Sequence, residues 1–290
     1  MPVRAHPVIW ILRAALVALP FTAGDAVAAA SGGRSDAVRL CIAVIAWLVW
    51  AIALVASIVP HPVSLTAVRI CAPALAVGAV WAAVDVRSAL GIAGAVSALV
   101  AAFASTSSFV ADGFIDGRSY GDERRFSLRA PAALLFGPIP LAWLFTVVGA
   151  VAGPLLLSAR VWAVGAVALV AGWVLALGSV RSLHSLALRF VVFVPAGMTL
   201  VDPLILVDSE LFARARIVRL GPALADSAAE DLTQNAPGLA IEIVSSEPVE
   251  LTVKEGRGVA APHVVSAVLF TPARPGALLD EAARRRISVG

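Results

Sequence analysis

The stretch VRLCIAVIAWLVWAIALVASIV at 38–59 decides the class of fold. After Arg39 it continues for twenty residues without a charged side chain. A helix rises about 1.5 Å per residue and the hydrocarbon core of a bilayer is about 30 Å thick, so this run is long enough to cross a membrane. It therefore predicts a transmembrane helix.

Five further stretches have the same character. Together they predict six spans, at 8–30, 38–59, 63–84, 88–110, 132–157 and 161–183. Short turns join most of them, and one longer polar loop, 111–131, separates the fourth from the fifth. The chain is 60% hydrophobic, whereas a soluble protein is about 45–50% apolar. We expect residues 1–183 to form an α-helical membrane bundle.

The first stretch leaves an alternative open. Pro20 and Asp25 interrupt it, and an Ala-rich run near 28–30 resembles the cleavage site of a signal peptide. Trp10 stands where an interfacial anchor is expected, and the apolar run is longer than a usual signal core. Without this span, five would remain.

Arginine placement predicts the orientation, because cytoplasmic loops carry an excess of positive charge. With a cytoplasmic N-terminus, about seven arginines lie inside and four outside. The cluster in the 111–131 loop decides the difference. We expect both termini to be cytoplasmic. Since Lys254 is the only lysine, the composition indicates a GC-rich bacterial genome, and hence the bacterial inner (cell) membrane.

The 111–131 loop holds the densest group of polar residues in the first 183. It contains the chain's only tyrosine and offers a candidate interaction loop made of Arg118, Tyr120, Asp122, Glu123, Arg124 and Arg125. One interpretation is a solvated, positive-inside determinant of topology. The other is a docking surface for the C-terminal domain, a partner protein or anionic lipid headgroups. Its acidic residues weaken the lipid interpretation.

Catalytic and cofactor signatures are missing from the sequence. It has no phosphate-binding glycine loop, no zinc-protease helix motif and no nucleophile elbow. The four histidines are isolated, and Cys41 and Cys71 are too far apart for a metal site. We predict no catalytic residue, no cofactor, no metal and no enzymatic activity.

Transport has only slight support in the sequence. Arg69 is the deepest charge, and snorkelling toward the interface accounts for it. Pro138 and Pro140 are expected to kink the fifth span or break it into halves, as in some transporters. The Gly149 and Gly153 pair is better explained by helix packing.

After residue 183 the long apolar runs give way to short alternating ones, typical of strands. Candidate strands lie at 189–194, 198–201, 205–207, 215–220, 239–244, 249–254 and 264–270, with tight turns at 195–197 and 245–248. Apolar residues at helical spacing predict one amphipathic helix at 275–287. Residues 184–290 hold 10 Lys/Arg and 12 acidic residues, so this domain is not a basic nucleic-acid binder.

Three patterns in this region resemble the bacterial pleckstrin-homology-like (PH-like) domains. They are the opening hairpin RFVVFVPAGMTLVD at 189–202, the strand IVRL at 217–220 and the strand-to-helix join AVLFTPARPGALL at 267–279. The resemblance implies a mainly-β barrel with one capping helix over residues 184–290. The segment 222–236 is longer and more acidic than the family's strand connections, and no basic phosphoinositide-like pocket is visible, so lipid binding does not carry over.

These observations lead to two hypotheses. In the first, a multi-pass anchor in the lipid bilayer presents a cytoplasmic PH-like interaction or scaffolding domain, which binds another protein or part of its own polar loop. In the alternative, the chain is a transporter or channel component that uses the kinked fifth helix and Arg69. The oligomeric state is not indicated by the sequence.

Overall fold

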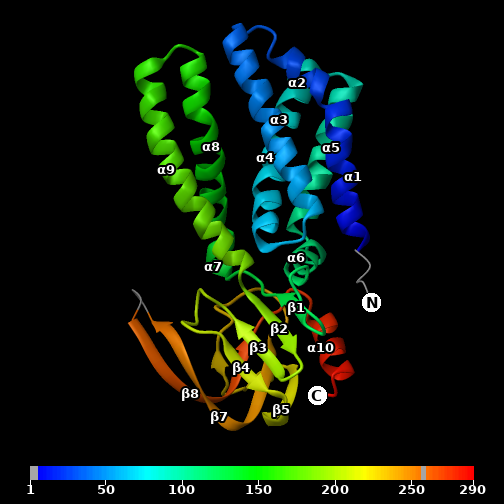
Figure 1. The fold of residues 1–290 in the computed structure, drawn as a ribbon, viewed down its shortest axis with the longest axis vertical. Helices are drawn as coiled ribbons and strands as arrows, with labels where there is room; N and C mark the ends of the chain where they lie inside the picture. The colour runs from blue at the N-terminus through cyan, green and yellow to red at the C-terminus, as the bar shows by residue number, and fades with distance from the viewer. Residues whose placement is uncertain (1–5, 256–258) are drawn as a thin grey trace. The chain divides into compact units, whose positions relative to one another are not determined.

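The computed structural model describes residues 6–255 and 259–290 and divides the chain into two compact units (Figure 1). The helical unit contains the chain up to Phe114 and Pro140–His184. The mixed unit contains Ile115–Ile139 and Ser185–Gly290. Part of the predicted membrane-domain loop is therefore grouped with the C-terminal region, and the mixed unit is assembled from two separate stretches of chain.

The helical elements match the six predicted spans closely. Five helices are long and apolar enough to cross a membrane, and a bent pair supplies a sixth if it is counted as one span. The bounds are α1 Pro7–Thr22, α2 Gly24–Ala30, α3 Asp36–Ile58, α4 Pro62–Val86, α5 Ala89–Thr106, α6 Ser108–Asp116, α7 Ala132–Leu135, α8 Pro138–Ser158 and α9 Trp162–Ala187. The multi-pass membrane character predicted from hydropathy is confirmed.

The first span is bent by 47° between α1 and α2. Pro20 has no N–H, so the carbonyl of Leu16, four residues earlier, lacks its helical donor. The indole Nε1 of Trp50, on α3, donates to that carbonyl at 2.8 Å. Leu12 and Leu16 are fully buried. The contacts of α1 are those of an integral helix of the unit, and a polar atom freed by proline is satisfied by a neighbouring helix.

The fourth apolar stretch ends earlier than predicted. Helix α5 stops at Thr106, and Ser107 starts α6, where its Oγ accepts from the N–H of Phe109 at 3.1 Å. Because α6 buries Val110, Ala111, Phe114 and Ile115, the first residues of the predicted polar loop are in fact an amphipathic helix. The loop proper begins at Gly117.

The fifth stretch is interrupted, but near its start. The chain leaves the helical conformation at Phe136 and Gly137 and starts α8 at Pro138. Pro138 and Pro140 thus lie in the first turn, where their missing donors cost no helical hydrogen bond. The prediction of two halves is wrong in this respect, because a single turn is separated from a helix of 21 residues.

Helices α8 and α9 pack together through glycine. A Cβ added at Gly149 would collide with the backbone of Gly172, and one added at Gly153 would collide with that of Leu169. The two backbones approach too closely for any larger side chain. The predicted packing role of Gly149 and Gly153 is confirmed.

The mixed unit contains two four-stranded sheets and one C-terminal helix. The first sheet has the order β1-β2-β3-β4 and the second β5-β7-β8-β6. The bounds are β1 Arg124–Ser127, β2 Phe190–Val194, β3 Gly197–Val201, β4 Glu210–Ala213, β5 Ile217–Pro222, β6 Glu230–Asp231, β7 Ile241–Glu255, β8 Val259–Phe270 and α10 Pro275–Arg284. These strand orders describe open sheets, and no pairing among the described strands closes them into a barrel.

The polar loop supplies the first strand of this unit. Strand β1 pairs antiparallel with β2, with Arg124 opposite Phe193 and Ser127 opposite Phe190. The transmembrane hairpin of α8 and α9 is therefore the connection between two neighbouring strands of one sheet. Sequence analysis predicted no strand here, since a four-residue segment, Arg-Arg-Phe-Ser, has too little alternation to be recognised.

The remaining strands differ from the predictions in several places: β4 and β6 were not predicted, and β8 begins at Val259 instead of 264. The turn predicted at 245–248 is wrong, because β7 runs through it from Ile241 to Glu255 with a change of register between Val244 and Val249. The extra residues form an irregularity in a continuous strand. The strand predicted at 205–207 is reduced to an isolated bridge, Leu206 to Val253. The tight turn at Pro195 and Ala196 joins β2 to β3 as predicted.

One hydrophobic core serves both sheets and α10. It includes Phe126, Phe193, Leu220 and Phe270, and the helix contributes Leu278. Phe126 comes from the loop, so the loop completes the core as well as the sheet. The amphipathic helix predicted at 275–287 is confirmed, although its last residues form a turn rather than helix.

Candidate functional site

The predicted interaction loop is held in place by one carboxylate. Asp116, at the end of α6, accepts from Arg124 Nη1 at 2.6 Å, from the Arg125 N–H at 2.9 Å and from Ser119 Oγ at 2.8 Å. The 117–123 turn is thereby closed back onto the start of β1. Two of the predicted site residues, Arg124 and Arg125, are held by this anchor.

Glu123 and Arg125 form a second contact within the loop. The Glu123 carboxylate accepts from Arg125 Nη2 at 2.9 Å and from the Tyr120 N–H at 3.3 Å. The hydrogen bond from Arg125 is the main cause that lowers the pKa of Glu123 below its ordinary value. The Arg125 guanidinium also lies over the Phe190 ring. These charges are used internally, so they do not form a free basic patch.

The other predicted loop residues differ in their surroundings. Tyr120 is 88% exposed, and Arg118 is exposed as well. Asp122 takes part through its backbone, because its carbonyl accepts from Arg285 Nη2. Arg285 follows α10, so this hydrogen bond joins the loop to the C-terminal end of the same unit. Four of the six predicted residues therefore make contacts within the mixed unit, and the other two, Arg118 and Tyr120, face solvent.

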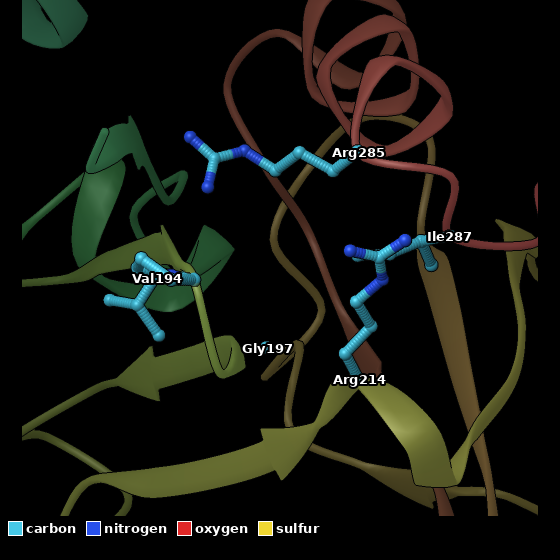
Figure 2. A pocket seen from close by; sticks show the side chains of 6 residues that line it. Val194, Gly197, Arg214, Arg285 and Ile287 are labelled. Carbon is cyan, nitrogen blue, oxygen red and sulfur yellow. The ribbon is translucent and has the colours of Figure 1, made fainter.

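A small pocket lies in this unit, next to Arg285. It has a volume of about 80 Å³ and is lined by Val194, Pro195, Gly197, Arg214, Arg285 and Ile287. Figure 2 shows Arg285 reaching in from the segment after α10 and Arg214 rising from the end of β4 on the other side. The β2–β3 turn and Ile287 provide apolar walls between the two guanidinium groups.

The two arginines have different roles. Arg285 Nε donates to Glu281 at 2.7 Å, and its guanidinium lies over the Phe193 ring. With the bond to Asp122, two of its five N–H groups have partners, and within the described part of the chain the other three have none. Arg214 is exposed, and no described carboxylate pairs with it. The pocket can therefore hold an anionic group, and it contains no acid–base pair or nucleophile.

Sequence analysis missed both arginines as site residues. Arg214 lies in a short 3-10 turn between β4 and β5, and Arg285 lies near the end of the predicted amphipathic helix, which was recognised by its apolar residues alone. Nothing in their spacing, 71 residues apart, indicates that they meet. Among the described residues, no group of three or more His, Cys, Asp and Glu side chains could hold a metal ion.

A buried ion pair lies where the chain passes from helices to sheet. Arg189 Nε and Nη2 donate to the two carboxylate oxygens of Asp202 at 2.8 and 2.6 Å, and Nη1 donates to the Arg129 carbonyl at 2.7 Å. The Arg189 side chain is 2% exposed. Arg129 follows β1 and Arg189 precedes β2, so the hydrogen bond from Arg189 to Arg129 joins the two segments that flank the α7–α9 connection.

The helical unit has a polar group of its own around α4. Arg69 Nε donates to the Ser105 carbonyl at 3.4 Å, and the buried carboxylate of Asp112 acts electrostatically on the same guanidinium. The Thr66 hydroxyl lies 2.9 Å from His184 Nδ1 on α9. The snorkelling interpretation of Arg69 missed Asp112, because that residue was assigned to the loop.

Comparisons with known proteins identify no relative for this chain. No family model, no curated protein and no solved structure matches it. The function must therefore be argued from the two units themselves.

Proposed function

We propose that this chain is a non-enzymatic interaction protein of the bacterial inner membrane, whose mixed unit recognises another protein at the cytoplasmic face. The observation that carries the proposal is the way the mixed unit is built. It has its own hydrophobic core. Strands β1 and β2 pair in one of its sheets, and the α8–α9 hairpin lies between them along the chain. A soluble module tied twice to a membrane hairpin is suited to hold a partner at the bilayer surface.

The PH-like relationship is part of this proposal. Two mainly antiparallel sheets followed by a single C-terminal amphipathic helix support it, as does the β2–β3 hairpin with its two-residue turn. Members of such a fold class serve as interaction modules, and the pocket between Arg214 and Arg285 provides a place for a partner's acidic group. The polar loop does not provide one, because it is already a strand of the unit.

The proposed orientation places both termini in the cytoplasm. Six spans return the chain to the side on which it started, and the arginine cluster of the loop favours the cytoplasm. Single cysteines at exposed positions test it, after Cys41 and Cys71 are changed to alanine. We expect a cysteine at Tyr120 to react only with a permeant reagent in intact cells and one at Ser35 to react with an impermeant one. The reverse pattern would invert the topology.

The partner is tested by photo-crosslinking in living cells. A photoreactive residue is placed at exposed positions spread over the mixed unit, such as Tyr120, Leu224 and Val264, and at the lipid-facing Val167 as a control. We expect at least one position on the mixed unit to capture the same protein repeatedly. Capture of nothing but lipid at every position would contradict the proposal.

Transport remains a second proposal, and one observation favours it. Arg69 and Asp112 place opposite charges near each other within the helical unit, and charges in such segments are costly to retain. The kinked fifth helix gives it less support, since Pro138 lies in the first turn of α8. Substrate flux in proteoliposomes that survives both Arg69→Ala and Pro138→Ala would exclude this version.

A further inference from the structure

The outer edges of the two sheets are mostly protected from pairing with another chain. The outer side of β1 receives Asp116, which accepts from the Arg125 N–H, and Ala273, which donates to the Ser127 carbonyl at 2.8 Å. The outer side of β5 is covered by the C-terminal residues, where Leu220 N–H donates to the Ser288 carbonyl at 2.9 Å. Uncovered edges invite pairing with other chains, so their coverage is meaningful.

The second sheet is protected in the same way on its other sides. The distal part of β7 pairs with the 205–207 segment, since Lys254 N–H donates to the Ile205 carbonyl at 2.7 Å. Strand β6 is only two residues long. The far edge of β8 carries Pro262, which has no N–H to offer a neighbour.

Strand β4 is the exception. It pairs with β3 on one side and ends the first sheet on the other. Because the Arg214 N–H donates to the Ala196 carbonyl, the alternation of an antiparallel ladder turns Phe212 toward β3 and turns the backbones of Leu211 and Ala213 outward. The Ala213 carbonyl accepts the first bond of the 3-10 turn that follows. Within the described residues nothing bonds to the Leu211 N–H and C=O or to the Ala213 N–H, and the Leu211 side chain is 45% exposed.

The pocket between Arg214 and Arg285 lies at the end of this open edge of β4. Arg214 follows β4 directly and lines the pocket, and Gly197, another lining residue, is opposite Ala213. A volume of about 80 Å³ is the share of roughly two or three water molecules in the liquid. It admits a single carboxylate, whereas a pocket for a whole small molecule is usually about 300 Å³ or larger.

We propose that an extended acidic segment of a partner protein binds as an added strand along β4 and places one carboxylate between Arg214 and Arg285. This inference rests on the proposed function and names the chemistry of its partner. The outward N–H and C=O groups of Leu211 and the N–H of Ala213 provide main-chain hydrogen bonds, and the pocket provides specificity. Glu210, at the other end of β4, repels an acidic residue and so favours placing it at the Arg214 end.

Ala213→Pro tests the added strand without disturbing the fold. Ala213 has φ −61°, which matches the angle that proline imposes, and its N–H faces away from β3. The change removes the outward N–H donor of residue 213 and places the proline ring at the outer edge of β4. Arg214→Gln tests the carboxylate, and Arg216→Gln is the matched control, because Arg216 is an exposed neighbour that pairs with Glu247 instead.

The measurement is a selection of random ten-residue displayed peptides against the full-length protein in neutral-lipid nanodiscs. We expect enriched peptides to combine β-forming residues with Asp or Glu near one end. Binding of a selected synthetic peptide is expected to weaken about tenfold or more in Arg214→Gln and in Ala213→Pro, and to be unchanged in Arg216→Gln. Thermal unfolding of each variant checks that it is folded.

The other outcomes contradict the inference. Absence of enrichment, enrichment of basic peptides, or binding that ignores Arg214 would each exclude it. A photoreactive residue at Leu211 that captures a second copy of this chain would assign the edge to self-association. Capture only at positions away from β4 would leave the proposed function standing while this site is rejected, so the two failures are distinguishable.

Discussion

Single polar side chains satisfy backbone groups that the membrane would otherwise leave without partners. Trp50 is the clearest case, since its indole replaces the helical donor that Pro20 removes from the Leu16 carbonyl. Arg13 acts similarly at the end of α3, where its Nε donates to the Ser57 carbonyl at 3.0 Å. Neither partnership is visible in the sequence, because donor and acceptor are more than thirty residues apart.

Trp50→Phe is expected to lower the stability of the helical unit by about 1 kcal/mol, since the Leu16 carbonyl loses the only donor that the described residues give it in an apolar setting. Unfolding of the purified protein in mixed micelles measures the change. Trp173→Phe is the control, because Trp173 is exposed on α9 and no described group bonds to its indole. Equal losses in the two variants would show that ring packing, and not the hydrogen bond, is responsible.

We expect the buried Arg189–Asp202 ion pair to contribute more to the unfolding free energy than the Trp50 hydrogen bond does. Arg189→Met leaves a buried carboxylate without its partner, and we expect a loss of about 3–5 kcal/mol in unfolding free energy of the mixed unit. Changing Arg189 to Met and Asp202 to Asn together is expected to cost less, because no buried charge is left alone. Arg216→Gln, at an exposed pair, serves as the reference with a loss of about 0–1 kcal/mol. Denaturant titration distinguishes the three.

Glu210 gives a prediction about pH. Burial raises the pKa of Glu210 above its ordinary value of 4.5, so the folded chain holds that proton more tightly than the unfolded chain. Stability therefore falls as pH rises through the window just above 4.5. Glu210→Gln is expected to be more stable than the native chain at neutral pH, and the difference should vanish below pH ~4. A difference that grows in acid would contradict this assignment.

Among the elements, glycine decides how closely α8 and α9 approach. Gly149→Val places a side chain where the Gly172 backbone lies, and overpacking of this kind costs about 1–3 kcal/mol. Gly178→Val, on α9, meets no atom within 4 Å and so controls for the change in helix propensity. Disulfide crosslinking between cysteines placed on α8 and α9 is expected to slow in the first variant and stay unchanged in the second.

The elements were predictable to different degrees. The spans follow from composition alone, because an uncharged run of twenty residues has one common structural solution. Strand β1 and the continuity of β7 were not predictable, since both depend on partners far along the chain. The same limit applies to the site. The loop residues were recognised as a polar cluster, but the Asp116 anchor and the Arg214–Arg285 pocket exist only after the strands pair.

For the whole molecule, the position of the hairpin predicts which fragment is soluble. A chain with residues 115–128 joined through an Asn-Gly turn to 189–290 keeps β1 and β2 as a tight hairpin, because Ser127 is opposite Phe190 and the Leu128 N–H donates to the Arg189 carbonyl. We expect it to be monomeric and to unfold cooperatively. Residues 189–290 alone lack Phe126 and Leu128 from the core, and we expect them to aggregate. Gel filtration compares the two.

The insertion of α8 and α9 between β1 and β2 also sets an order of events during synthesis. Strand β1 leaves the ribosome 62 residues before β2, since residues 128–189 separate them. Its partner strand is made only after both hairpin helices, α8 and α9, have been synthesised. Strand β1 therefore has no β2 to pair with, and Phe126 has no Phe193 to pack against, until that later segment is made. The hydrophobic core of the mixed unit is thus completed only after the α8–α9 hairpin has been synthesised.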